Sequence, residues 1–381
     1  MIYLDHAAAT PLRREVATAM AEIAHAPYGN PSSSHGWGRA ARAALEDARE
    51  RAAQALATAP RRVHFVRGGT ESINLAILGR VDWALASGRA RPWLLRSTLE
   101  HSAVRAAMAA AEARGCIVQT IDVSPTADIV LPAGGAGALQ GAALVSVQWV
   151  NQETGLRLPV EALAESCAEA GVPLHVDAIQ AGGKLHIDMS AHPISALSLS
   201  GHKLGGPAST GLLVLAEGVE LHPRVFGGGQ ERGLRPGTED VAGAVGFAVA
   251  LDISVRQLER ETVRLAALRE RLETGLLGRL PRLRVHGAEG PRAPHILNVG
   301  VPDTSPDLLH AALDGAGIAA SPGTACRSGA VTASPVLRAL YGEEATRNAP
   351  LRLSLGWPSK PGEVDRAVKT VSAVVEGFSA R

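Results

Sequence analysis

Short apolar runs alternate with longer segments of helical periodicity from the N-terminal part of the chain as far as Ala250. Strands buried on both faces are apolar throughout, and their alternation with helices is typical of a mainly parallel sheet covered on both sides. The predicted strands are Val63–Val66, Trp93–Ser97, Ile117–Ile121, Leu144–Val150, Leu174–Asp177, Ala196–Ser200 and Gly211–Leu215. Predicted helices between them include Arg39–Leu56, Glu71–Leu78, Val104–Arg114 and Val160–Ala170. We therefore predict an α/β fold in which helices sandwich a mainly parallel, seven-stranded sheet.

The pattern changes after Ala250, where leucines at near-helical spacing in a charged sequence predict a long connecting helix. A second, smaller α/β unit is expected beyond it. Its predicted parts are strands near Arg284–His286 and His295–Val299, a helix from Asp307, a loop at Ser321–Gly329, a strand at Leu351–Leu355 and a last helix at Glu363–Phe378. We expect a large domain over residues 14–250, and a small domain built from residues 1–13 and 251–381.

Composition narrows the class of protein. The chain is 46% hydrophobic and 20% charged with a net charge of +1, which fits a soluble globular protein and gives no basic excess for nucleic acid or a membrane surface. No apolar run reaches the ~18 residues that a bilayer requires. The N-terminus lacks the pattern of a signal peptide, so we expect a cytoplasmic protein. The three widely spaced cysteines include no CxxC, which argues against zinc and disulfides.

Four segments with candidate chemistry follow predicted strands, where open α/β sheets bind ligands. They are Val66–Ser72, His175–Gln180, Ser198–Lys203 and Ser321–Gly329. In the first segment, a glycine turn leads into a helix, and the N–H groups of the helix N-terminus together with Thr70 suit a phosphate. A simple strand–turn–helix with Thr70 as the N-cap explains the same pattern equally well. In the second, Asp177 would keep a cofactor's pyridine nitrogen protonated, unless it only caps a turn.

The other two segments offer nucleophiles. Lys203 follows a strand and a turn of small residues, and desolvation would fit it to form a Schiff base, whereas most single lysines are solvated. Cys326 lies in a glycine-flanked polar loop beside Arg327, and a neighbouring cation favours the thiolate. Cys116 and Cys167 are expected to be buried small hydrophobic residues.

These residues, in this order, resemble the cysteine desulfurases typified by NifS and IscS, which belong to the fold-type-I pyridoxal-phosphate enzymes, and the resemblance runs nearly end to end. The matching motifs are Tyr3-Leu4-Asp5-His6-Ala7-Ala8, Gly29-Asn30-Pro31-Ser32-Ser33, Thr70-Glu71-Ser72, Glu100-His101, Val150-Asn151 with Glu153 and Gly155, His175 to Gln180, Gly201-His202-Lys203, Gly227-Gly228-Gly229-Gln230-Glu231, Gly237-Thr238, Ala325-Cys326, and Arg352 with Ser354 and Gly356.

The resemblance implies pyridoxal 5'-phosphate as the cofactor. Lys203 would bind it covalently and move protons at Cα, Asp177 would pair with its ring nitrogen, and His101 would stack on the ring and assist proton transfer, unless His101 is a core or capping residue. Gln180 would contact the phenolic oxygen. The phosphate and the remaining cofactor contacts would involve Gly69, Thr70, Gln152, Ser200, His202 and, from the second subunit of a homodimer, Thr238.

The resemblance also implies the reaction. Arg352 would grip the carboxylate of L-cysteine bidentately, with Asn151 also at the substrate. Cys326 would take the sulfur as a persulfide, releasing L-alanine, and pass it to a sulfur-acceptor protein, as in iron–sulfur cluster assembly or tRNA thiolation. Gly323 and Gly329 would be hinges of the loop that carries Cys326.

The chain departs from the family at several positions. Gln152 stands where the family usually has Asn, Arg67 replaces a small hydroxyl residue and would crowd or further charge the phosphate, and Pro207-Ala208-Ser209 replaces Pro-Lys-Gly. The chain also ends soon after its last predicted helix, whereas some relatives carry a tail that docks an iron–sulfur scaffold. These departures indicate a specialised member, serving a dedicated thiolation pathway.

Other activities are compatible with parts of the pattern. A selenocysteine lyase would share the fold and the cofactor, whereas an aminotransferase has no need of the Cys326 thiol. A non-catalytic sulfur-relay scaffold would be free to lose Lys203, Asp177, His101 or Cys326, yet all four are present. A metal site on His175 and Asp177 has no visible third ligand, so no metal is expected.

Overall fold

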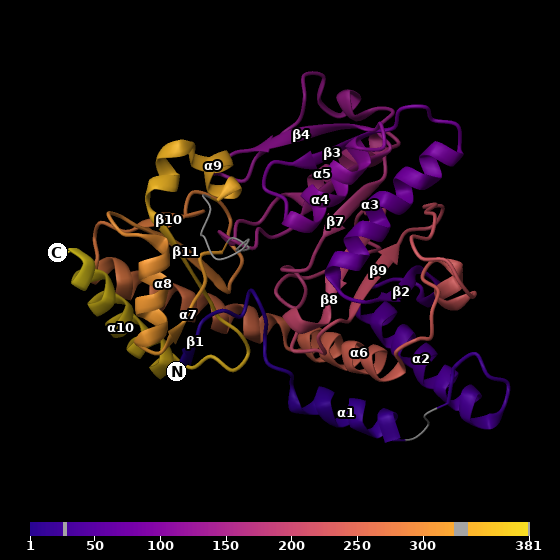
Figure 1. The fold of residues 1–381 in the computed structure, drawn as a ribbon, viewed down its shortest axis with the longest axis horizontal. Helices are drawn as coiled ribbons and strands as arrows, with labels where there is room; N and C mark the ends of the chain where they lie inside the picture. The colour runs from indigo at the N-terminus through magenta and orange to yellow at the C-terminus, as the bar shows by residue number, and fades with distance from the viewer. Residues whose placement is uncertain (26–28, 324–333, 380–381) are drawn as a thin grey trace.

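The computed structural model describes residues 1–25, 29–323 and 334–379. Figure 1 shows two groups of elements side by side, one around an eight-stranded sheet and one around a three-stranded sheet. The helices are α1 (Arg14–His25), α2 (Gly36–Ala55), α3 (Gly69–Ala86), α4 (Ser102–Glu112), α5 (Val160–Glu169), α6 (Val241–Arg256), α7 (Leu258–Arg279), α8 (Pro306–Gly315), α9 (Pro335–Tyr341) and α10 (Pro361–Ser379).

The large sheet has the strand order β2-β9-β8-β7-β6-β3-β4-β5. Its strands are β2 (Val63–Val66), β3 (Trp93–Ser97), β4 (Ile117–Val123), β5 (Ile129–Val130), β6 (Leu144–Gln148), β7 (Leu174–Asp177), β8 (Ala196–Ser200) and β9 (Gly211–Leu215). Strands β4, β3, β6, β7 and β8 are parallel, and β9 and β5 run in the opposite direction to their neighbours. All seven predicted strands are present, and β5 adds an eighth that is too short to show a sequence pattern.

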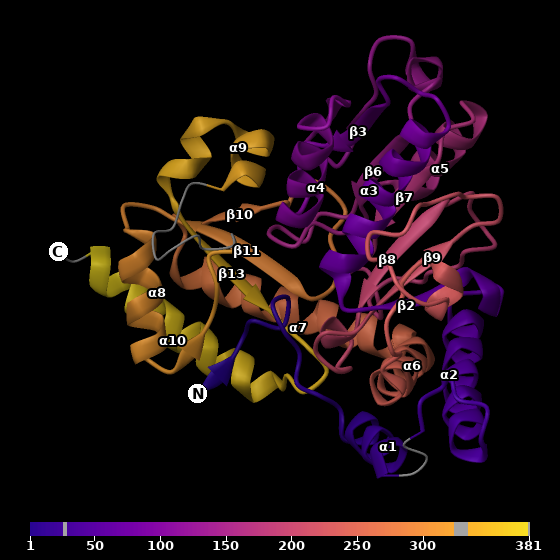
Figure 2. The ribbon, with the colours of Figure 1, turned by 45° about the vertical axis from the view of Figure 1, so that its right-hand side comes forward.

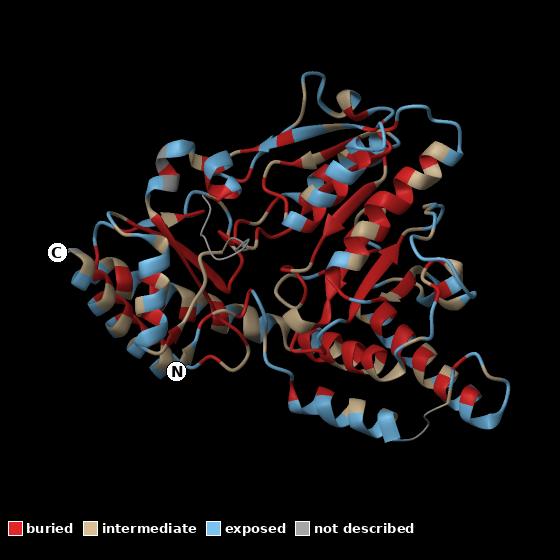
Figure 3. Cartoon of the chain, viewed as in Figure 1, coloured by how far each residue is buried: buried red, intermediate tan, exposed pale blue. Residues whose placement is uncertain are grey.

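Helices cover both faces of this sheet, as predicted. Residues of α3 and α4 form one core with Leu94 and Leu144. Residues of α5, α6 and the end of α2 pack in a larger core with Val145, Val147 and Leu197. The middle strands β6, β7, β8 and β9 are buried at every position, and in β6, β7 and β8 polar residues such as His175 and Ser198 interrupt the apolar ones. Figure 3 shows these buried strands between helices whose outer faces are exposed.

The second group is built on an antiparallel sheet of β10 (Arg284–His286), β11 (Ile296–Val301) and β13 (Ala349–Ser354). Leu265, Leu268, Leu272 and Leu276 of α7 are buried in its core, so the predicted periodicity marks the packed face of that helix. The N-terminal strand β1 (Ile2–Tyr3) pairs with β12 (Ile318–Ala319), and Leu4 joins the same core. The first residues of the chain therefore pack with its last third (Figure 2).

Helices α6 and α7 meet at a bend of 74° at Gln257. The sequence predicted α7 but not α6, because α6 is apolar on most of its surface and shows no amphipathic period. Within the described residues no single helix is long and apolar enough to cross a membrane, although the bent pair passes that test on length and composition together.

Candidate active site

The carboxyl ends of neighbouring strands bring the predicted site residues to one edge of the large sheet. Asp177 is the last residue of β7, and Ser200 is the last residue of β8. Strand β2 runs in the same direction as β8, because each is antiparallel to β9, so the turn that leads to Thr70 lies at this edge as well. Three of the four sequence segments thus converge as the strand prediction required.

Asp177 is buried, with 5% of its surface exposed. Its Oδ1 accepts a hydrogen bond from the backbone N–H of Ile179 at 3.0 Å. Burial raises the pKa of Asp177 to about 6, against the opposing effects of that hydrogen bond and of the positive charge on Lys203. A buried carboxylate with this pKa is still mainly ionised at neutral pH, and it suits a cationic ring nitrogen as a partner.

Lys203 ends the short helical turn η3 (Gly201–Lys203) that follows β8. Its Nζ donates hydrogen bonds to the carbonyl oxygens of Ala7 and Ala8, at 2.5 and 2.6 Å. Burial and, to a smaller extent, the positive charge of Arg352 lower the pKa of Lys203 to about 8. Roughly a tenth of the Lys203 amine is therefore neutral at pH 7, far more than for an ordinary lysine, and the neutral amine is the form that attacks a carbonyl carbon.

The backbone of the N-terminal segment completes this part of the site, and this contact was not predicted from the sequence. Gln180 donates from Nε2 to the carbonyl of Ala7 at 2.8 Å, so Gln180 and Lys203 share that carbonyl. The Oε1 of Gln180 lies 3.3 Å from Nε2 of the buried His295. The Asp5-to-Ala8 motif was visible in the sequence, but only the fold brings its backbone next to Lys203.

The start of α3 provides a cradle for an anion. Gly68 precedes the helix with a φ of 91°, and the first N–H groups of a helix have no partner within it. A Cβ at Gly69 would lie 2.2 Å from Cδ1 of Ile179, so a larger residue here would require the Ile179 side chain, two residues after Asp177, to move. Ser200 Oγ and His202 Nδ1 are 2.9 Å apart. This set of N–H and hydroxyl donors fits a phosphate.

His101 lies at the N-terminus of α4, where its Nδ1 accepts a hydrogen bond from the N–H of Ala103 at 3.1 Å. Burial lowers the pKa of His101 to about 4, with a smaller contribution from the charge of Lys203. The ring is therefore neutral at neutral pH, and its proton is on Nε2 because Nδ1 is an acceptor. His101 therefore caps helix α4, as the alternative to a cofactor contact predicted. Its Nε2 is not used by the cap and is left for a contact with the cofactor.

Arg352 in β13 is almost fully buried. It donates to Asp5 Oδ1 at 2.6 Å and to the carbonyl of Gln152 at 2.9 Å. Its Nε is buried and has no hydrogen-bond partner among the described residues. A buried guanidinium N–H without a partner fits a carboxylate ligand, since guanidinium groups bind carboxylates through parallel hydrogen bonds.

Asn151 and Gln152 form the turn after β6. The side chain of Asn151 donates to the carbonyl of Leu99 and accepts from the N–H groups of Glu153 and Thr154, so it holds the turn in place. The side chain of Gln152 hydrogen-bonds to Glu153. The contacts expected of Asn151 with substrate and of Gln152 with the cofactor stay predictions.

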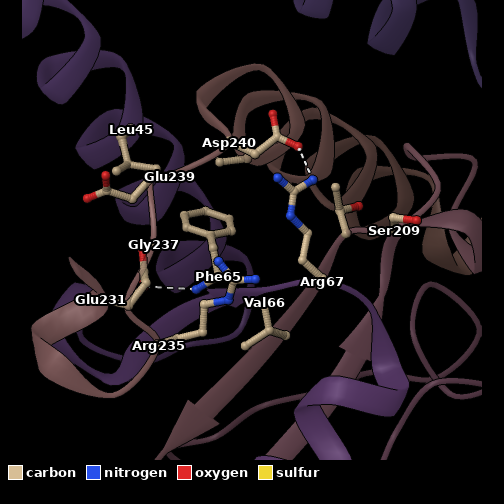
Figure 4. A pocket seen from close by; sticks show the side chains of 12 residues that line it. Leu45, Phe65, Val66, Arg67, Ser209, Glu231, Arg235, Gly237, Glu239 and Asp240 are labelled. Atoms are coloured by element: carbon tan, nitrogen blue, oxygen red, sulfur yellow. Dashed lines mark hydrogen bonds and ion pairs between the residues drawn. The ribbon is translucent and has the colours of Figure 1, made fainter. Parts of the chain in front are cut away.

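Arg67 is paired with Asp240, the N-cap of α6, at 3.0 Å. Figure 4 shows the two side chains pointing toward one another above a pocket that Arg235 and Gly237 also line. Thr238 follows in that loop and is exposed. Its predicted contact with the phosphate of a second subunit stays a prediction.

Cys326, Arg327 and Gly329 lie outside the described residues, whereas Gly323 is described and has a φ of 86°. Cys116 and Cys167 are buried, as predicted, and burial raises the pKa of both thiols, that of Cys167 to about 12. Neither is therefore a ready thiolate at neutral pH.

His175 has both ring nitrogens within hydrogen-bond distance of serine hydroxyl groups, at 2.8 Å from Ser146 and 2.9 Å from Ser198. Its ring therefore serves the packing of three neighbouring strands. Among residues 1–25, 29–323 and 334–379, no group of three or more His, Cys, Asp or Glu side chains could hold a metal ion.

Comparisons with known proteins agree with this geometry. The family model "Aminotransferase class-V" matches residues 2–367. An "IscS-like cysteine desulfurase" of Mycobacterium tuberculosis is 40% identical, over 98% of this chain and 96% of its own length. A solved structure titled "NifS-like protein" superposes with a TM-score of 0.88 at 30% identity, covering 99% of both chains. Another, titled "SspA in complex with cysteine", has a TM-score of 0.78 at 29% identity and covers 93% of this chain and 99% of that one.

Proposed function

The chain belongs to the aminotransferase class-V family and, through its full-length relatives, to the cysteine desulfurases, and on this premise we propose that it removes the sulfur atom of L-cysteine and forms L-alanine. The observation that supports this most is the placement of Lys203 and Asp177 at the ends of the neighbouring strands β8 and β7. Lys203 is a half-buried amine whose pKa is lowered, and Asp177 is a buried carboxylate.

The donor set fits pyridoxal phosphate as the cofactor. Asp177 would hold the protonated ring nitrogen, Gln180 the phenolic oxygen, and Lys203 the aldehyde carbon. The helix start at Gly69 and Thr70, together with Ser200 and His202, would hold the phosphate, and Thr238 of a second subunit would complete it. When bound, this cofactor supplies an electron sink that stabilises negative charge at the substrate Cα.

The side chains of this chain would then position the substrate and move its protons. Arg352 would bind the substrate carboxylate through the buried Nε–H that has no protein partner. The neutral amine of Lys203 would take the proton from Cα and return it. His101, whose Nε2 carries the proton of a neutral ring, would donate a hydrogen bond or a proton from that atom.

Cys326 would accept the sulfur. Its thiolate attacks the sulfur of the bound cysteine, and a S–S bond forms as the substrate Cβ–S bond breaks. The electron pair of the broken bond stays with the substrate, whose Cβ takes up a proton, so that alanine leaves and a persulfide remains on Cys326. The persulfide would then pass to a sulfur-acceptor protein.

We infer a homodimer with a large domain of residues 14–250 and a small domain of residues 1–13 and 251–381. It would act in the cytoplasm and supply sulfur for iron–sulfur cluster assembly or tRNA thiolation. The departures at Arg67 and Gln152 support a specialised member with a dedicated acceptor. Equal sulfur delivery to a general iron–sulfur scaffold and to a thiolation acceptor would count against that specialisation.

The test of the reaction measures alanine and sulfide released from L-cysteine with added pyridoxal phosphate and a reductant. We expect equimolar products from the wild type and almost none from Cys326→Ala, with normal cofactor absorbance in both. Products that persist undiminished in Cys326→Ala would indicate a lyase that does not use this thiol. A wild type that binds the cofactor but releases neither product would overturn the proposal.

A further inference from the structure

Glu100 is a fully buried carboxyl group in the turn between β3 and α4, with none of its surface exposed. Its Oε1 accepts hydrogen bonds from Ser97 Oγ at 2.5 Å and from the N–H of Gln148 at 3.0 Å. Its Oε2 is buried and has no hydrogen-bond partner in the described part of the chain. An ionised carboxylate left in this way would retain an uncompensated charge in the protein interior, which is costly.

A second oxygen nearby has the same deficit. The side-chain amide of Gln148 donates from Nε2 to the carbonyl of Leu99, and Asn151 donates to that carbonyl as well, at 3.2 Å. These bonds fix the amide of Gln148, because its nitrogen must face a carbonyl oxygen. Its Oε1 is buried and has no partner among the described residues. The turn thus contains two buried acceptor oxygens without a donor, and a proton on Glu100 would turn one of them into a donor.

The charges around Glu100 favour that proton. Asp177 pairs in register with Gln148 across β6 and β7, so a second carboxyl group faces the same region. Burial raises the pKa of Glu100 to about 8, and the charge of Asp177 acts in the same direction, whereas the hydrogen bonds from Ser97 and Gln148 and the charge of Arg96 oppose the rise. The nearby Arg105 donates to the backbone carbonyl of Glu100. The next residue, His101, is neutral, since burial lowers its pKa to about 4.

We propose that Glu100 is a positioning residue that works as a neutral carboxylic acid. Through Ser97 and Gln148 it ties the turn that precedes His101 to the end of β6. Because it carries no charge, the negative charge at this edge of the sheet stays on Asp177, where the ring nitrogen of the cofactor is expected. The positioning role rests on the proposed function, because it assumes that His101 and Asp177 contact the cofactor. The protonation of Glu100 does not depend on the proposed function.

The first experiment records infrared difference spectra of the apoprotein at pH 7, wild type against Glu100→Gln. We expect the wild type to show the carbonyl band of a protonated carboxylic acid, and Glu100→Gln to lack it. Glu153→Gln is the matched control, because Glu153 is another buried carboxyl group, hydrogen-bonded to Ser334 at 2.5 Å. That variant should retain the band assigned to Glu100. If Glu100→Gln instead loses a band of an ionised carboxylate, the proposal is overturned.

The second experiment follows the visible absorbance of the bound cofactor as a function of pH. Removing a buried negative charge beside Asp177 would move the midpoint by about one pH unit or more. We expect the midpoint of Glu100→Gln to match the wild type, because a neutral amide replaces a neutral acid. A shift of that size would contradict a neutral Glu100, even if desulfurase activity is found. If the infrared band is present but the protein does not turn over cysteine, Glu100 is protonated and only the proposed function is refuted.

Discussion

The guanidinium group of Arg49 donates two hydrogen bonds to the carboxylate of Glu231, at 2.7 and 2.8 Å, and each side chain is 2% exposed. Glu231 also accepts from the backbone N–H of Phe65 in β2 at 2.9 Å. Glu231 and Arg232 have φ values of 47° and 58°, which are unfavourable for residues other than glycine. The ion pair therefore holds a strained segment against the strand that leads to Thr70.

Replacing Glu231 by Gln should destabilise the protein, because the buried Arg49 would lose its buried counter-charge and keep only the half-exposed Glu46, 3.0 Å away. Losses of about 3–5 kcal/mol are typical when one partner of a buried pair is removed. The measurement is urea unfolding of the apoprotein. Asp303→Asn is the control, since Asp303 pairs with Arg282 at the surface, where a loss below about 1 kcal/mol is expected. Equal effects of the two variants would contradict this prediction.

Asp177→Asn should stabilise the apoprotein at neutral pH while it abolishes turnover. Burial raises the folded-state pKa of Asp177 from 3.8 to about 6, so the folded protein loses stability as the pH rises through this interval. Asparagine does not ionise, and a shift of this size corresponds to about 2–3 kcal/mol.

The thermal midpoints of both apoproteins between pH 4 and 8 test this, where we expect the advantage of Asp177→Asn to shrink as the pH falls below 6. The exposed Asp314→Asn is the control. An advantage that is equal at all pH values would contradict an origin in the ionisation of Asp177.

The rate at which added pyridoxal phosphate links covalently to the apoprotein should rise with pH, with a midpoint near the pKa of Lys203, which burial lowers to about 8. Arg352→Gln should move this midpoint upward. The variant removes a nearby cation and also frees Asp5, whose negative charge raises the pKa of Lys203. Stopped-flow absorbance measures the rate, with the distant Arg282→Gln as control. A midpoint that is the same in all three proteins would show that Arg352 does not tune Lys203.

Gly69→Ala should weaken cofactor binding, because the new Cβ would lie 2.2 Å from Cδ1 of Ile179. Overpacking of this kind costs about 1–3 kcal/mol. Ile179→Val removes that Cδ1 atom, so the double variant should bind pyridoxal phosphate more tightly than Gly69→Ala alone in a fluorescence titration. Gly229→Ala is the control, since nothing lies within 4 Å of the added atom there. If Ile179→Val gives no rescue, the contact does not limit binding.

The sequence predicted the elements whose own residues carry a clear pattern. The fully buried strand β9 was visible as an unbroken apolar run, and β6 to β8 were visible as short runs in which a few polar residues interrupt the apolar ones. Helix α7 was visible because one face of leucines packs against a core. Helix α9 has only seven residues, and α6 is apolar nearly all round, so neither has a readable period. The ends of predicted elements were displaced by a few residues, since helix and strand ends depend on caps and neighbours.

For the site, the sequence alone determined which chemical groups are available. It also determined that three of the segments that carry these groups follow strands. The direction of those strands then brings Thr70, Asp177 and Lys203 to one edge, because parallel strands end on the same side of a sheet. Only the tertiary structure decided which groups they meet. The carbonyls of Ala7 and Ala8 contact Lys203 across nearly the whole large domain, and Asp5 contacts Arg352 across 347 residues. Such long-range contacts depend on how two cores pack together, and the resulting burial sets the pKa values of Asp177 and Lys203.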